Sequence, residues 1–151
     1  MPLTDTDPRA VTAGMREVLV WRRTFPGRPD QAAQVRRFAG FLLADLANCD
    51  EIIEVTGELT NNALVHSGSG LPGGRLTAEV RRWPGTCASV AIIDDGGPSD
   101  PSFRHDPADV DDLDALSEGG RGLPLVTALT SWWGWEGGPG GRTVTAFFLG
   151  R

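Results

Sequence analysis

The chain has 151 residues, of which 40% are hydrophobic and 23% charged, as expected for one globular domain rather than a disordered or fibrous protein. Twenty Asp and Glu residues against fourteen basic ones give a net charge of -6, which argues against a nonspecific nucleic-acid binder. All fourteen basic residues are Arg, so the sequence lacks the lysine that a Walker A loop or a Schiff-base enzyme needs.

The first residues predict a tail followed by a strand. Residues 1–15 are polar and contain two prolines, so we expect a flexible leader before a single domain over residues 16–151. Branched and aromatic side chains over residues 18–25 predict a strand, which the turn pair Pro26 and Gly27 ends.

Two amphipathic helices are expected next. The first follows Pro29 for about four or five turns and places apolar residues at helical spacing, namely Ala33, Phe38, Phe41, Leu42 and Leu46. Asp50 is a favourable N-cap for the second helix. The residues of that helix separate into an apolar stripe and a polar stripe, the first with Ile52, Ile53, Leu59 and Ala63 and the second with Glu51, Glu58, Asn62 and His66.

The second half of the chain predicts a hairpin, an acidic segment, a short helix and a last strand. Strands over residues 75–83 and 88–93 are joined by a Pro-Gly turn. Nine of the twenty acidic residues lie from Asp94 to Glu118, in a segment that is either a solvated loop or a functional one. A helix over 123–129 and a strand over 142–149 follow, and we expect three tryptophans between them to be core and sheet-edge residues, with a partner-binding patch as the alternative: Trp132, Trp133 and Trp135.

The cysteines and the lack of targeting signals predict a cytoplasmic protein. Cys49 and Cys87 are far apart in the sequence and form no metal-binding pattern, so we expect two reduced core residues. The sequence shows neither a signal peptide nor an apolar run long enough to span a bilayer.

Glu58 and Asn62 form the first of four local motifs that suggest chemistry. They are four residues apart in the second predicted helix, so both side chains lie on one face. A carboxylate next to an amide oxygen suits a general base beside a ligand of Mg²⁺. The alternative is a solvated polar face.

The other three motifs each suggest a ligand contact. Asp94 ends an apolar strand, where it can accept a hydrogen bond from an exocyclic amine, and Gly96 leaves room for a planar ring. The glycines at 119, 120 and 122 precede a helix, where free N–H groups favour an anion. Thr143 enters the last strand with a hydroxyl that could contact a ligand. Each motif alone is common, and Asp94 with its glycines also fits a plain turn.

In this order and spacing, the four motifs resemble the ATP-binding domain of the GHKL superfamily, which includes gyrase, Hsp90, histidine kinases and MutL-type proteins. The resemblance extends from Phe25 to Phe148 and is closest to the anti-sigma factor serine/threonine kinases and related small bacterial regulators. It implies a two-layer α/β sandwich, with a mixed sheet and helices on one face.

The resemblance also implies a role for each matching residue. Glu58 is the general-base candidate, and Asn62 would bind Mg²⁺. Asp94 would accept a hydrogen bond from the adenine amino group of ATP. The remaining matches would contact ATP in the adenine pocket, in the glycine box after an ATP lid, and in the last strand: Gly96, Gly120, Arg121, Gly122, Leu123 and Thr143.

For function, the resemblance implies a kinase that phosphorylates a serine of an anti-sigma antagonist protein and binds a sigma factor in exchange. The expected partners are these proteins and a second copy of the chain, with no nucleic acid or membrane. The alternative is an ATP-binding module that binds a partner without phosphoryl transfer. Val65, where many relatives carry a basic residue, leaves this alternative open. The catalytic half of a histidine kinase is disfavoured, because the dimerisation helices are missing.

Overall fold

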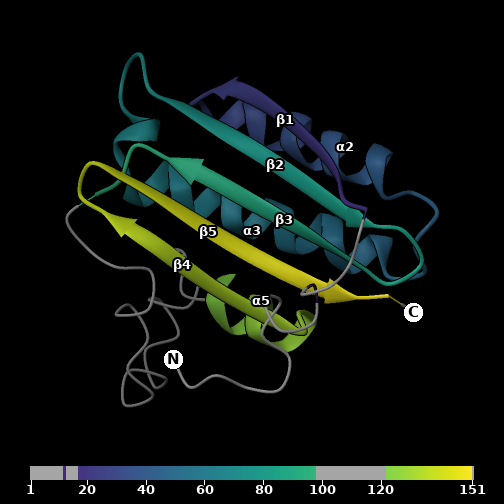
Figure 1. Ribbon diagram of the computed structural model, residues 1–151. Coiled ribbons are helices and arrows are strands. Elements are labelled where there is room, and N and C mark those ends of the chain that lie inside the picture. The colour runs from purple at the N-terminus through teal and green to yellow at the C-terminus, as the bar shows by residue number, and fades with distance from the viewer. Residues whose placement is uncertain (1–11, 13–16, 98–121, 151) are drawn as a thin grey trace.

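The computed structural model describes residues 12, 17–97 and 122–150 (Figure 1). The predicted leader, except Thr12, and most of the acidic segment lie outside these residues. In chain order the elements are β1 (Leu19–Pro26), η1 (Pro29–Gln31), α2 (Ala32–Leu42), α3 (Cys49–His66), η2 (Gly68–Gly70), β2 (Arg75–Trp83), β3 (Cys87–Asp94), α5 (Gly122–Leu129), β4 (Trp132–Gly138) and β5 (Gly141–Leu149).

The described strands form one five-stranded sheet in the order β1-β2-β3-β5-β4. Figure 1 shows the helices gathered behind this sheet, with α2 behind β1 and β2 and α3 behind the centre. The packing agrees, because α2 contacts β2 and α3 contacts β3 and β5. The predicted two-layer α/β sandwich with helices on one face is therefore confirmed.

The sheet is antiparallel between every pair of neighbouring described strands, which corrects the mixed sheet that we expected. A strand, a helix and a following strand usually give a parallel pair. Here β3 and β4 do run in the same direction, since both are antiparallel to β5. They are not neighbours, because β5 lies between them and pairs with both.

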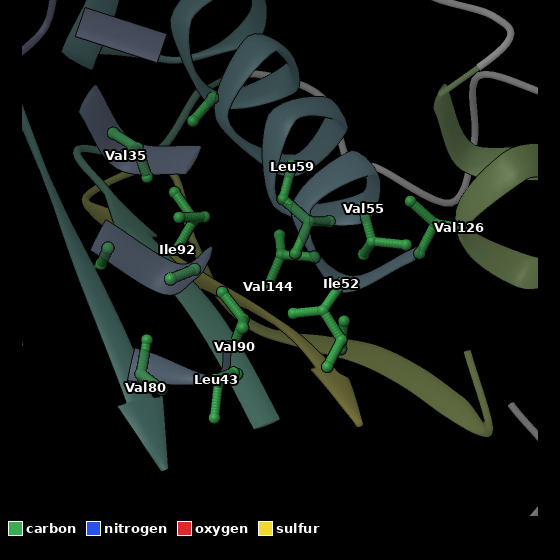
Figure 2. Packing of buried hydrophobic residues seen from close by; sticks show 14 of the residues in the cluster. Val35, Leu43, Ile52, Val55, Leu59, Val80, Val90, Ile92, Val126 and Val144 are labelled. Carbon is green, nitrogen blue, oxygen red and sulfur yellow. The ribbon is translucent and has the colours of Figure 1, made fainter. Parts of the chain in front are cut away.

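The core lies between α3 and the centre of the sheet. Figure 2 shows Leu59 and Ile52 of α3 pointing toward Val90 and Val144 of the sheet. Val126 of α5 is also buried in this cluster and lies near Val55 of α3. The predicted apolar stripe of α3 is thus largely correct.

The first predicted helix is shorter than expected, and one of its predicted apolar residues is exposed. A 3₁₀ turn precedes α2, and its buried face consists of Ala32, Val35 and Ala39, followed by buried Leu43. Phe41, which we placed in the apolar stripe, is 84% exposed. Successive helix residues are about 100° apart, so a side chain two positions after Ala39 lies on the opposite face. Of the other predicted stripe residues, Phe38, Leu42 and Leu46 pack partly buried against the core cluster, so Phe41 is the clear departure from the predicted stripe.

The tryptophan-rich segment forms β4, an edge strand that the sequence did not predict. Trp133 and Trp135 pack against the core cluster, as expected for sheet-edge residues. Trp132 is on the other face and covers Gly134, where an added Cβ would lie 2.4 Å from its ring. Within the described part of the chain, no helix has the length and apolar character needed to cross a bilayer.

Candidate functional site

Glu58 and Asn62 lie in the second half of α3, on the side of the helix that borders the buried stripe. Both are half-buried, whereas Leu59 and Ala63 beside them are buried. Thr56 and Thr60 are buried as well, and their hydroxyls donate to the carbonyls of residues 52 and 56, four positions earlier, at 2.7 Å. The helix therefore satisfies its own buried hydroxyls.

Asp94, the last residue of β3, is a buried carboxylate whose two oxygens differ. The residue is 5% exposed. Oδ1 accepts a hydrogen bond from the Gly96 N–H at 2.6 Å. Oδ2 is fully buried and accepts no hydrogen bond from the residues that the structure describes. The nearest cationic atom is Nε of Arg142 on β5, at 3.6 Å, which is an ion pair but too long for a hydrogen bond. One oxygen is thus fixed by the backbone, and the other can still accept a donor.

Burial raises the pKa of the Asp94 carboxyl above its ordinary value. The Gly96 N–H and the Arg142 guanidinium act in the opposite direction, because they stabilise the carboxylate. Asp95 adds repulsion that raises the pKa further. Perturbed carboxyls of this kind gather at functional sites.

Gly96 is held in a close backbone contact with the β4–β5 turn. Its φ is +77°. An added Cβ would lie 2.4 Å from the carbonyl oxygen of Gly138 and 2.6 Å from the amide nitrogen of Gly141. Gly97 is similarly confined, because a Cβ there would lie 2.3 Å from the carbonyl oxygen of His66. Backbone from three parts of the chain meets at this turn, which we name the acidic turn (Asp94 to Gly97).

The end of α3 is joined to the acidic turn through η2. The Gly68 N–H donates to the Gly96 carbonyl at 2.8 Å, and the Asp95 N–H donates to the Ser69 hydroxyl at 2.9 Å. Ser69 is completely buried. The helix that carries Glu58 and Asn62 is therefore connected directly to the turn that carries Asp94.

Thr143 and Asp94 are not on the same face of the sheet. In the β3–β5 register, Thr143 is opposite Ile93, and Arg142 is opposite Asp94. Side chains alternate along a strand, and buried Val144 fixes the helix side of β5. Arg142, on that side too, is 3% exposed and lies beside Asp94. Thr143 is therefore directed away from the helices.

The glycine-box residues are only partly described. Gly120 and Arg121 lie outside the described residues, so their positions stay predictions. Gly122 and Leu123 are the first two residues of α5, and Pro124 follows in the first turn, as we expected. α5 packs against α3 and β4, which places the glycine-box helix beside the helix of Glu58 and Asn62.

Two residues of this region, Arg142 and Ser69, were not predicted from the sequence. The sequence pattern could have identified Arg142 as a buried residue. Val144, Ala146 and Phe148 alternate as core residues, and this alternation extends back to position 142. An arginine at a core position needs a buried acidic partner, which is Asp94. Ser69 had no such signal, since it lies in a glycine-rich segment that resembles any turn.

A comparison with curated proteins finds no match to this chain. A comparison with protein families matches residues 25–148 to the histidine kinase-like ATPase domain. The matched span includes α3, the acidic turn, α5 and nearly all of β5. The chain therefore belongs to the histidine kinase-like ATPase domain family, in which ATP is the ligand that the domain binds.

Proposed function

We propose that the chain binds Mg-ATP between α3, the acidic turn and α5, and transfers its γ-phosphoryl group to a serine of an antagonist protein. The observation that carries the binding part is the Asp94 carboxylate. Its Oδ2 is buried, while Oδ1 is held at 2.6 Å by the Gly96 N–H. A buried acceptor without a hydrogen bond costs free energy, so binding a donor there is favourable. The amino group of adenine can supply that donor.

The phosphate end of ATP would lie toward Asn62 and the start of α5. Asn62 supplies a side-chain oxygen, and Glu58 supplies a carboxylate one turn earlier on the same helix face. Mg²⁺ needs only one or two protein oxygens when phosphate oxygens and waters complete its shell, so the Asn62 oxygen alone fits the ion and Glu58 is left for proton transfer. Bound there, Mg²⁺ would neutralise charge on the triphosphate. Backbone N–H groups at the start of α5 would support the same phosphates.

In the transfer step, Glu58 acts as the general base. A serine hydroxyl of the antagonist gives its proton to the Glu58 carboxylate as its oxygen forms a bond to the γ-phosphorus. The bond from that phosphorus to the bridging oxygen breaks, and ADP leaves with the electron pair. The helix fixes Glu58 next to Asn62, so base and phosphate ligand are positioned together before the partner arrives.

A second candidate function is ATP-dependent binding of a partner without phosphoryl transfer. The observation that favours it is Val65, whose side chain is 65% exposed near the end of α3. An exposed valine supplies no positive charge to a transferring phosphoryl group, whereas Arg or Lys would. In both candidates the partners are a sigma factor and its antagonist protein, as the resemblance implies.

The kinase proposal is tested with γ-labelled ATP, Mg²⁺ and candidate antagonist proteins from the same genome. We expect label on one antagonist with the wild type and a loss of at least about a hundredfold in rate with Glu58→Gln, which keeps size but removes the base. The matched control is Glu54→Gln, because Glu54 is an exposed residue one turn earlier on α3.

The outcomes separate the two candidates. ATP binding without label on any antagonist would reject the kinase and leave the binding module. Equal rates for the wild type and Glu58→Gln would reject Glu58 as the base. If isothermal titration shows no ATP binding by the wild type, both candidates fail.

A further inference from the structure

Arg142 and Asp94 form a buried ion pair across β3 and β5, on the sheet face that the helices cover. The two residues are directly opposite in the strand register, and their side chains are 2% and 1% exposed. We propose that Arg142 makes the site specific for adenine, by keeping Oδ2 of Asp94 a hydrogen-bond acceptor. This inference rests on the proposed binding of ATP and adds a specificity-determining residue to that site.

The geometry determines which carboxyl oxygen of Asp94 can be protonated and so change from a hydrogen-bond acceptor to a donor. Oδ1 is occupied by the Gly96 N–H at 2.6 Å. A proton on the carboxyl would therefore be on Oδ2, which accepts no hydrogen bond within the described part of the chain and is the oxygen that pairs with Arg142. Deprotonated, Oδ2 accepts from the 6-amino group of adenine. Protonated, it donates instead, and then suits a purine with a 6-carbonyl, such as guanine or hypoxanthine.

Among the described residues, two charged side chains act on this equilibrium, Arg142 and Asp95. Burial raises the pKa of Asp94, and Asp95, the next residue in the chain, raises it as well. Arg142 on β5 opposes both by its charge. Without that charge, the same burial would favour the protonated, donating form at higher pH. Arg142 thus determines the pH at which the site changes from an acceptor to a donor.

The strand register makes Arg142 a positioning residue rather than a direct ligand of the base. Its backbone lies between Gly141 and Thr143 at the start of β5, and the preceding turn packs on Gly96. Nε lies 3.6 Å from Oδ2, close enough for a charge effect but too far for a hydrogen bond that would occupy the oxygen. The acceptor is stabilised, and no donor among the described residues occupies it.

The test compares the affinities for ATP and for inosine triphosphate, which has a carbonyl in place of the 6-amino group. Both are measured by calorimetry from pH 5.5 to 8.5 for the wild type, Arg142→Gln, Arg142→Met and Arg142→Lys. Gln and Met are both neutral, but one is polar and the other apolar. We use both so that at least one folded variant lacks the positive charge. Thermal melting confirms folding at each pH.

We expect the wild type to prefer ATP by about tenfold or more above pH 6.5. In the neutral variants the preference should fall to within about threefold as the pH drops to 5.5 and return at pH 8.5, since one unit of pKa is a tenfold change in protonation. Arg142→Lys, which keeps the charge, should retain the wild-type pH profile.

Three results would overturn the inference. The first is an unchanged preference and pH profile in the folded neutral variants. The second is a loss that is equal at every pH and shared by Arg142→Lys, which indicates a structural role only. The third is a wild type that binds both nucleotides equally. A wild type that binds neither nucleotide rejects the proposed function itself, which is a separate outcome.

Discussion

Gly96 shows how one residue can be fixed both by its conformation and by its neighbours. Its φ of +77° lies in the left-handed region that residues with a Cβ rarely adopt. An added Cβ would also lie 2.4 Å from the Gly138 carbonyl oxygen. The sequence predicts a glycine here for the approach of a ring, and the structure shows a second reason, the approach of the β4–β5 turn.

The Gly96→Ala variant should therefore lose both stability and ATP binding. We expect a loss of about 3 kcal/mol or more in the free energy of unfolding, because backbone strain and an overlap with backbone atoms add together. Urea denaturation measures the loss, and titration with ATP measures the affinity.

Gly85→Ala is the matched control. Gly85 has the same φ of +77°, but an added Cβ there meets nothing within 4 Å. Only the strain remains, about 1 kcal/mol, and ATP affinity should not change. Equal losses in the two variants would contradict the argument from packing.

Glu79 is a second residue whose surroundings set its charge. It is 6% exposed, and its two carboxylate oxygens accept from Arg22 and, at 2.5 Å, from Arg81. Burial raises the pKa of Glu79, but the hydrogen bonds and the charges of Arg81 and Arg22 together lower it by more, so the net direction is down. In the unfolded chain the pKa returns to its ordinary value.

Glu79 therefore stabilises the fold above the unfolded pKa of about 4.3, and this stabilisation is lost as the pH falls toward the lower folded pKa. We expect Glu79→Gln to cost about 1 to 3 kcal/mol at pH 7, the value of hydrogen bonds to a charged group. The difference from the wild type should shrink in urea denaturation below pH 4. A difference that stays constant with pH would show that the carboxylate charge contributes nothing.

At the scale of elements, the connection from α3 through η2 to the acidic turn holds the two halves of the site together. The Ser69 hydroxyl is the side chain in this connection, because it accepts from the Asp95 N–H at 2.9 Å while being fully buried. Removing it leaves a backbone donor without that acceptor, next to Asp94.

We expect Ser69→Ala to lower the free energy of unfolding by about 1 to 3 kcal/mol and to weaken ATP binding. Ser67→Ala is the control. Ser67 donates to the Ala63 carbonyl at 2.6 Å and accepts from the Ser69 N–H at 3.0 Å, so its hydroxyl contacts stay within α3 and η2. The Ser67→Ala variant should lose stability but keep its ATP affinity. Equal affinities for Ser69→Ala and the wild type would reject the positioning role of Ser69.

The elements also show where sequence patterns work and where they do not. The hairpin of β2 and β3 was predicted to within one residue at each end, since its strands are long apolar or alternating runs around a Pro-Gly turn. β4 was missed because glycines at 134, 137 and 138 weaken its strand pattern. It is a strand only because β5 pairs with it along its whole length.

At the scale of the whole molecule, ATP binding should stabilise the native state. A ligand that binds only the folded protein adds about 2.7 kcal/mol at one hundred times its dissociation constant. For a chain of this size we expect a rise of about 5 to 10 °C in the melting temperature. Differential scanning calorimetry with and without Mg-ATP measures the rise.

Asp94→Ala is the variant to compare, since it removes the proposed adenine acceptor. Its melting temperature should not respond to Mg-ATP. A full response in Asp94→Ala would mean that the nucleotide binds elsewhere or without this carboxylate.

The sequence by itself determined the buried face of α3 and the local chemistry, whereas the two layers of the fold were implied by the family resemblance. Helical spacing gave α3 its buried stripe and placed Glu58 and Asn62 one turn apart, because those relations depend only on backbone geometry. Likewise, the apolar run that ends at Asp94 was enough to place a carboxylate at the end of a strand.

Only the tertiary structure decided what surrounds that carboxylate. The insertion of β5 between β3 and β4 made the sheet antiparallel and put Arg142, rather than Thr143, beside Asp94. Strand order and register come from the packing of the whole sheet on its helices, and a shift of one residue reverses every side chain. The partner of the buried acid is therefore a property of the fold, while the acid itself is a property of the sequence.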